Sequence, residues 1–279
     1  MKIIRRKLDH ATISIDKPEY PIFAGITITN DDKIMFDWDK DSPRDVLKLA
    51  ESTSGKFIQD GITYFYAYTW SDTATPYQIN RVRRYLKSLG ETNDLYGQDV
   101  EDFVELGVLK FDEFKSLKSF SVLVGIEPSK FPSLVDVMNG YLMEYSQLPI
   151  VDIRLVKNTY DHVEFDSSKA YKALLESGLT QHRAAREIQF TIRKFQELKT
   201  SGTLFEMKRF LPRAIREGFY NFLKFKTEEE KQLYMKLQGV DVLIYDDFLT
   251  SGSTVKEVVR YLKSIHNENQ LTVFVLVKQ

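Results

Sequence analysis

One short segment near the C-terminal end constrains the fold more than any other part of the sequence. Residues 242–245 are apolar, and two aspartates come directly after them, at positions 246 and 247. A run of small hydroxyl residues around a glycine occupies 250–254, and an amphipathic pattern begins at 255. This order predicts a buried strand, a polar loop and a helix. Open α/β sheets bind anionic ligands at the carboxyl ends of strands, in front of helix N-termini, so the segment predicts a ligand site.

The loop has the chemistry of a phosphate-binding site. Gly252 permits the positive φ or the close backbone approach that lets N–H groups wrap around an anion. Thr250, Ser251, Ser253 and Thr254 add hydroxyl donors, and the next helix directs the positive end of its dipole to the same place. We therefore expect a phosphate in this loop.

The two carboxylates indicate a different part of the same ligand. Asp246 and Asp247 would repel a phosphate placed on them, but they suit vicinal hydroxyls or a hydrated Mg²⁺. A phosphate beside a diol describes a ribose 5-phosphate. The alternative is a polar turn that only caps a helix, because Ser and Thr are ordinary N-cap residues.

Residues 242–254 resemble the 5-phosphoribosyl 1-pyrophosphate (PRPP) signature of the type I phosphoribosyltransferases. That signature is an apolar strand, two acidic residues, two apolar residues and a Thr/Ser-Thr/Ser-Gly-x-Thr loop, and every position fits. The resemblance implies that Asp246 and Asp247 bind the ribose hydroxyls, with Mg²⁺ held directly or through water. It also implies that the 5-phosphate binds to Thr250, Ser251, Gly252, Ser253 and Thr254. Some relatives carry an aspartate general base where this chain has Thr250, so no catalytic residue is assigned.

A second segment resembles the first strand–helix–strand unit of the same family. Residues 120–126 predict a buried strand, 134–145 a helix, and 149–156 a second strand. In relatives the loop after the first strand binds pyrophosphate. The residues that would do so here are Glu127, Pro128, Ser129, Lys130 and, after the second strand, Lys157. A generic surface loop with solvated lysines is the alternative.

The resemblance covers residues 116–279 and implies an α/β fold, with a phosphoribosyltransferase-like parallel sheet and flanking helices. We expect residues 166–238 to form an insert that is helical throughout. Residues 1–115 match no motif and predict an α+β N-terminal region, which is a candidate for the hood that covers the active site in the family. In this region the patterns predict strands at 11–15, 23–28 and 63–69 and helices at 76–89, 99–106 and 111–117.

The insert contains a basic stretch. Residues 180–216 include nine Lys or Arg and three Glu. Arg209, Arg213 and Arg216 would share one helical face, provided that Pro212 does not interrupt the helix. A solvated face is the preferred interpretation, and an anionic substrate or a nucleic-acid backbone are the alternatives.

Composition excludes several classes of protein. The chain has no cysteine, which rules out disulfides and thiolate metal sites, and its four histidines are scattered. The formal net charge of −1 predicts no general attraction to nucleic acid or membranes. The sequence has no apolar run long enough for a bilayer and begins with no signal peptide, so we expect a cytoplasmic protein.

These observations leave two classes of function. The first is an enzyme that uses PRPP and Mg²⁺ to transfer a phosphoribosyl group to an unidentified nitrogen acceptor, with release of pyrophosphate. The second is a regulatory protein that senses PRPP or a nucleotide without catalysis, or a nucleic-acid-associated protein of the same fold. The family resemblance also implies a homodimer.

Overall fold

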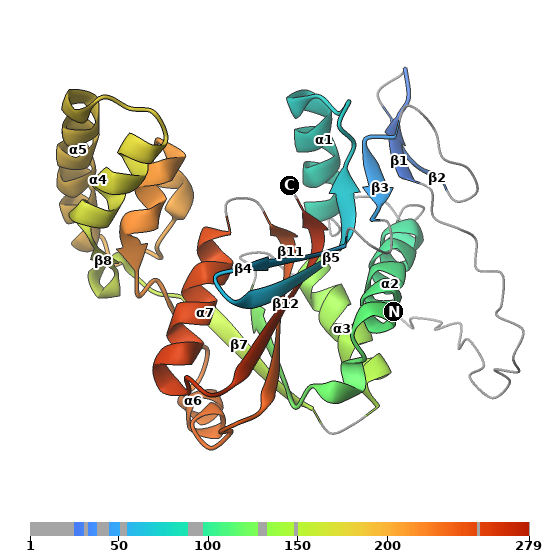
Figure 1. Cartoon of the computed structure of the whole chain (residues 1–279). Helices are drawn as coiled ribbons and strands as arrows, with labels where there is room; N and C mark the ends of the chain where they lie inside the picture. Colours follow the sequence, from blue (N-terminus) through green and yellow to red (C-terminus); the bar gives the residue numbers. More distant parts are fainter. Residues whose placement is uncertain are drawn as a thin grey trace, which may run out of the picture.

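Five neighbouring strands run parallel at the centre of a ten-stranded mixed sheet, in the order β7-β6-β11-β12-β5 (Figure 1). The computed structural model describes residues 25–30, 33–37, 45–50, 55–88, 97–127, 133–147, 150–249 and 252–278. The parallel strands are β5 (Ile62–Trp70), β6 (Val122–Ile126), β7 (Val151–Lys157), β11 (Asp241–Leu249) and β12 (Gln270–Lys278).

Antiparallel strands extend the sheet at both sides. On the β7 side the edge strand is β10 (Leu223–Phe225). On the β5 side, the short strands of the N-terminal region pair with β5 or with each other. They are β1 (Gly25–Ile28), β2 (Ile34–Asp37), β3 (Leu47–Leu49) and β4 (Lys56–Gln59).

Helices cover both faces of the sheet. One face packs against α1 (Pro76–Lys87), α2 (Gly97–Phe114) and α3 (Leu134–Ser146). The other face packs against α6 (Glu228–Tyr234) and α7 (Ser253–Ile265). Local signals start these helices, since Thr75 and Gln78 form a capping box at α1, and Thr227 and Glu230 form another at α6. The α/β class predicted from the sequence is confirmed.

The N-terminal region shares this sheet with the segment that carries the motif, because β5 pairs along its length with β12. The strand predicted at 63–69 and the helix predicted at 76–89 are confirmed as β5 and α1. The two helices predicted at 99–106 and 111–117 form one helix, α2, which runs through Gly107 and ends at Phe114. The strand predicted at 11–15 lies outside the described residues.

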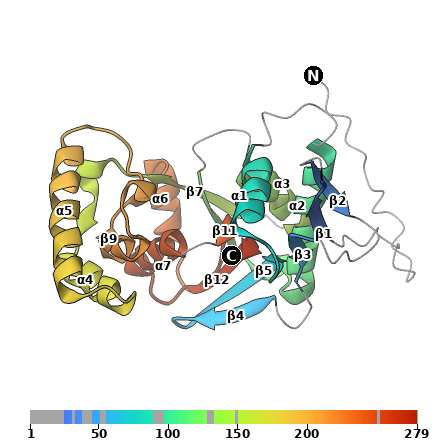
Figure 2. The same cartoon turned by 90° about the horizontal axis from the view of Figure 1, so that it is seen from above.

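The insert lies beyond α7, at one end of the molecule (Figures 1 and 2). It holds α4 (Ser167–Glu176), α5 (Gln181–Lys199) and the two-stranded sheet of β8 (Glu164–Phe165) and β9 (Phe219–Tyr220). Its core is aromatic, with the rings of Phe210 and Phe219 4.4 Å apart. The prediction of helix throughout 166–238 is wrong, because residues 200–227 form 3₁₀ turns and short strands instead of α-helix.

Two contacts fasten the insert to α7. Arg260 Nη2 donates a hydrogen bond of 2.6 Å to Asn221 Oδ1, and Lys256 Nζ lies 3.5 Å from Glu217 Oε2. The start of α7 and the insert are therefore held side by side. Within the described ranges, no helix has the combination of length and apolar character that a membrane span requires.

A glycine in β6 makes room for the buried tyrosine of β11. A Cβ atom added at Gly125 would lie 2.4 Å from Tyr245 Oη and 2.5 Å from its Cζ, which is closer than real contacts allow. The tyrosine ring therefore packs directly against the β6 backbone, in the space that a side chain at position 125 would occupy.

We predict that Gly125→Ala lowers the free energy of unfolding by about 1–3 kcal/mol, because the packed core must shift to admit a methyl group. The matched control is Gly140→Ala in α3, where nothing lies within 4 Å of an added Cβ. There the substitution should stabilise the protein by about 0.5–1 kcal/mol, since alanine is the better helix former. Urea unfolding measures both changes. Equal stabilities for Gly125→Ala and the wild type would contradict this account of the β6–β11 contact.

Candidate functional site

The order of the parallel strands reverses between β6 and β11. From β6 the chain passes through α3 to β7 on one side, whereas from β11 it passes through α7 to β12 on the other. Because α3 and α7 cover opposite faces, the two connections diverge above the carboxyl ends of β6 and β11. Open α/β sheets bind their ligands in the crevice at such a switch point. The candidate site is therefore a consequence of the topology alone.

Asp246 and Asp247 lie at this switch point. Pairing of β11 with β6 ends at Tyr245, opposite Gly125, whereas pairing with β12 continues to Leu249. The prediction that the strand ends before the aspartates is wrong, because β12 carries β11 four residues further. Both aspartates nevertheless stand just beyond the last pair with β6, and both side chains are partly exposed.

The N-terminal region contributes a cation to the aspartate pair. Lys87 Nζ, at the end of α1, lies 2.8 Å from Asp247 Oδ2 and 3.1 Å from its Oδ1. The same ammonium lies 5.1 Å from the centre of the Phe248 ring, which stacks on Trp70 at 6.4 Å. Since α1 directly follows the carboxyl end of β5, it stands at the edge of the sheet where the aspartates lie (Figure 1).

The environment of Asp246 favours its protonated form. Burial, followed by the negative charge of Asp247, raises the pKa of Asp246 from 3.8 to about 7, although Lys87 acts in the opposite direction. The amide of Asp247 donates to Asp246 Oδ1 at 2.9 Å. Asp246 can therefore change its protonation state near neutral pH, and it can act as a donor or an acceptor toward a hydroxyl group.

The predicted phosphate loop is described in part. Gly252 has φ +71° and is the N-cap residue of α7, which confirms the expected left-handed conformation. Ser253 is buried and Thr254 half-buried in the first turn of the helix. Thr250 and Ser251 lie outside the described residues. The helix dipole and the first amides of α7 thus lie at the carboxyl-terminal ends of the strands, a few residues after the aspartates in the chain.

Lys157, at the end of β7, belongs to the same group of charges. Desolvation lowers the pKa of its ammonium, and the positive charges of Lys208 and Lys87 add to this, while Glu206 and Asp246 oppose it. These neighbours come from the insert, from α1 and from β11. Lys87, Lys208 and Glu206 were not predicted, because no local pattern connects them to the motif and only the fold brings them near it.

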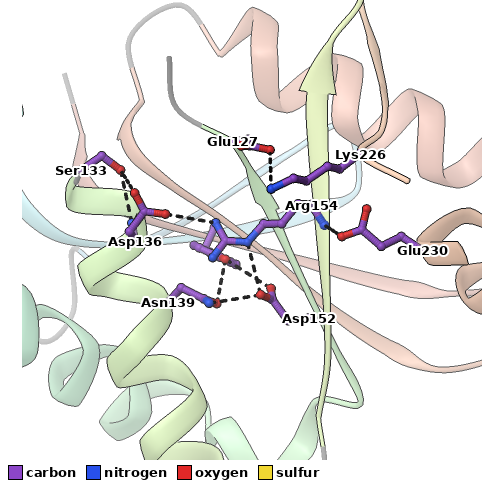
Figure 3. Close-up of polar contacts among 9 residues, drawn as sticks. Glu127, Ser133, Asp136, Asn139, Asp152, Arg154, Lys226 and Glu230 are labelled. Carbon is purple, nitrogen blue, oxygen red and sulfur yellow. Dashed lines mark hydrogen bonds and ion pairs between the residues drawn. The ribbon is translucent and has the colours of Figure 1, made fainter. Parts of the chain in front are cut away.

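Glu127 follows β6, and its carboxylate pairs with a lysine that follows β10. Its Oε2 lies 3.1 Å from Lys226 Nζ (Figure 3). Pro128, Ser129 and Lys130, also predicted to bind pyrophosphate, lie outside the described residues. Of the described residues predicted to bind pyrophosphate, Lys157 interacts electrostatically with Asp246, whereas Glu127 pairs with Lys226.

A network of polar side chains connects the elements that meet at the switch point. Tyr245 Oη donates to Asn139 Oδ1 at 2.8 Å, and Asn139 Nδ2 donates to Asp152 Oδ2 at 3.1 Å. Arg154 Nε lies 3.2 Å from the same Asp152 oxygen, and Arg154 Nη1 lies 3.9 Å from Asp136 Oδ1 (Figure 3). These contacts tie the first turns of α3 to β7 and β11. No local pattern in the sequence indicates them, since the residues are far apart in the chain.

The predicted arginine stripe does not exist. Arg209 ends a 3₁₀ turn, and Arg213 and Arg216 belong to a second one that Pro212 caps. Proline removes a backbone donor and breaks the helix that the stripe requires. Arg209 instead pairs with Glu206 at 2.9 Å, and Arg216 Nε donates to the carbonyl oxygen of Phe210 at 3.1 Å.

The described side chains do not make a closed metal site, because no three His, Asp or Glu residues among them gather around one point. Mg²⁺ often binds to one or two carboxylates together with substrate oxygens and water. Asp246 and Asp247 fit that mode, in which the metal arrives with the ligand.

Comparisons with known proteins give short or distant matches. No protein-family model matches the chain. The transcriptional regulator GfcR of Methanococcus vannielii is 45% identical over 53 residues, which is 17% of this chain and 26% of that protein. GfcR of Methanococcus maripaludis is 43% identical over 53 residues, with the same coverage. The chain thus matches about a quarter of the length of these curated relatives.

A hypoxanthine phosphoribosyltransferase structure from Staphylococcus aureus aligns with 71% of each chain, at 12% identity and a TM-score of 0.31. A score this low does not establish a common fold.

We predict that Asp246→Asn increases stability in a pH-dependent way. The folded-state pKa of Asp246 is raised, so charging this group costs folding free energy as the pH rises from about 4 to about 7. The gain in unfolding free energy of the variant over the wild type should therefore grow across that window and then remain constant. Urea titrations at several pH values measure it.

Asp72→Asn is the matched control, because Asp72 lies exposed in the turn before α1. The change in stability for Asp246→Asn is compared with that for Asp72→Asn at each pH value. A difference for Asp246→Asn that is the same at pH 4 and pH 8 would contradict a raised pKa for this partly buried carboxyl.

Proposed function

We propose that the protein binds a ribose 5-phosphate compound, with PRPP as the leading candidate, in the crevice between β6 and β11. The observation that carries the proposal is the arrangement on one strand–loop–helix unit. Two carboxylates stand at the switch point, and a left-handed glycine and a helix N-terminus come within the next several residues. The diol of a ribose phosphate would contact the two carboxylates, and its phosphate would contact the helix N-terminus.

The charges around the aspartates support a polyanionic ligand. Lys87 and Lys208 come from two other elements and repel Lys157, although Lys87 also pairs with Asp247 and Lys208 with Glu206. A pyrophosphate group with Mg²⁺ would relieve this repulsion, and bound Mg²⁺ would neutralise charge on the leaving group. Asp246 and Asp247 would hold the metal, directly or through water.

The proposed reaction is transfer of the phosphoribosyl group to a nitrogen acceptor. The nitrogen forms a bond to the anomeric carbon, and the bond from that carbon to the pyrophosphate oxygen breaks. Pyrophosphate leaves with the electron pair, and the proton of the nitrogen passes to a base. Asp246 and Asp247 would hold the ribose in line, Lys157 would face the leaving group, and the helix start at Ser253 would anchor the 5-phosphate.

A second candidate is a regulatory protein that binds the same ligand without turnover. The match to proteins named as transcriptional regulators favours it, although that match covers a quarter of their length. Both candidates share the ligand site, and they differ in whether bound PRPP is converted to products.

We predict that the double variant Asp246→Asn/Asp247→Asn weakens PRPP–Mg²⁺ binding by about a hundredfold or more, since each hydrogen bond to a charged group is worth about 1.5–3 kcal/mol. Isothermal titration calorimetry measures the affinity, and Asp72→Asn is the control with the same chemical change. Wild-type affinity in a folded double variant would overturn the ligand assignment.

Pyrophosphate release separates the two candidates. Purine and pyrimidine bases are offered one at a time as acceptors. An enzyme should release pyrophosphate faster when one of these bases is present. A sensor should bind PRPP and release no pyrophosphate with any base.

A further inference from the structure

Helix α5 presents a basic face at the outer end of the insert. The residues that share this face repeat at helical spacing and are all exposed: Arg183, Arg186, Phe190, Arg193 and Glu197. The opposite face, with Ala184, Ile188, Thr191 and Phe195, is buried against the insert. Figures 1 and 2 place α5 beyond α7, so its outward face does not line the switch point.

Three arginines of this face make no direct ion pair with the described residues. In the part of the chain that the structure describes, Arg183, Arg186 and Arg193 form no ion pair, whereas Arg209 and Lys208 both pair with Glu206. Helix α5 as a whole has five basic and two acidic residues. These three side chains are therefore exposed to solvent and available to an anionic partner.

The local architecture suits a groove-binding helix. A four-residue connection, residues 177–180, joins α4 to α5, and Gly178 within it has φ +91°. The connection makes α4 and α5 a compact pair of helices. Thr180 caps α5 and accepts from the amide of Arg183, so the basic face begins in the first turn of a well-defined helix.

We propose that this face of α5 binds duplex DNA through Arg183, Arg186 and Arg193. Arginine is the preferred partner of phosphate and of guanine edges, and the major groove of B-form DNA, about 12 Å wide, admits an α-helix. The helix of 19 residues is about 28 Å long, which spans most of one turn of the duplex. A-form RNA has a major groove too narrow for a helix, which selects DNA over double-stranded RNA.

The test uses the full chain and a fluorescent duplex of mixed sequence, about 30 base pairs long, with anisotropy measured over a range of salt concentrations. Wild-type protein should bind, with an affinity that falls steeply as salt rises, by about 0.9 logarithmic units per decade of salt for each phosphate contact. Arg183→Gln/Arg186→Gln/Arg193→Gln should reduce this slope by about 2–3 and weaken binding at low salt at least tenfold.

The matched control removes three other exposed cations: Lys118→Gln, Lys224→Gln and Lys236→Gln. It changes the net charge equally and should leave DNA binding near the wild-type level. Circular dichroism verifies that both triple variants fold.

Three outcomes would overturn the proposal: no DNA binding by the wild type at low salt, an equal loss in both triple variants, or tighter binding of duplex RNA or single-stranded DNA than of the duplex. None of these outcomes bears on PRPP binding, because the triple variant leaves Asp246 and Asp247 intact.

Discussion

The end of the β6–β11 pairing is the feature on which the rest of the site depends. Pairing stops at Gly125 and Tyr245 because the chain leaves β6 for α3 on one face, while β11 continues with β12 and then enters α7 on the other face. The carboxylates after Tyr245 therefore have a neighbouring strand on the β12 side and none on the β6 side. The polar network of Asn139, Asp152 and Arg154 below them holds the two diverging elements in place.

The two carboxylates at the switch point repel each other before any ligand binds. Asp246 lies next to Asp247 in a partly buried place, so its pKa rises to about 7, and Lys87 compensates for only part of this. Folding a chain with such a pair costs free energy that simple packing would not require. Sites that break the ordinary rules of polar burial are commonly functional, because the ligand supplies the missing partners. A metal ion or sugar hydroxyls between the carboxylates would do so here.

The sequence predicted the elements around the motif well, because their signals are local. The buried strand 242–245, the left-handed Gly252, the cap at Thr227 and the amphipathic helices α1, α3 and α7 all result from periodicity, capping or glycine chemistry. The failures have a common physical cause, since they depend on partners distant in the chain. Pairing with β12 extends β11 past the aspartates. In residues 200–227, aromatic packing and Pro212 favour short turns and strands over the predicted helix. Lys87 pairs with Asp247, 160 residues away in the chain. The exposure of the α5 arginines likewise depends on the fold, which decides which side of that helix is buried.

A crystal structure with PRPP and Mg²⁺ bound tests the central claim most directly. We expect ribose hydroxyls within hydrogen-bonding distance of the Asp246 and Asp247 carboxylates. We also expect the 5-phosphate against the backbone amides at Gly252–Thr254, where α7 begins. A ligand bound elsewhere, or a sugar at the switch point that contacts neither aspartate, would contradict this claim.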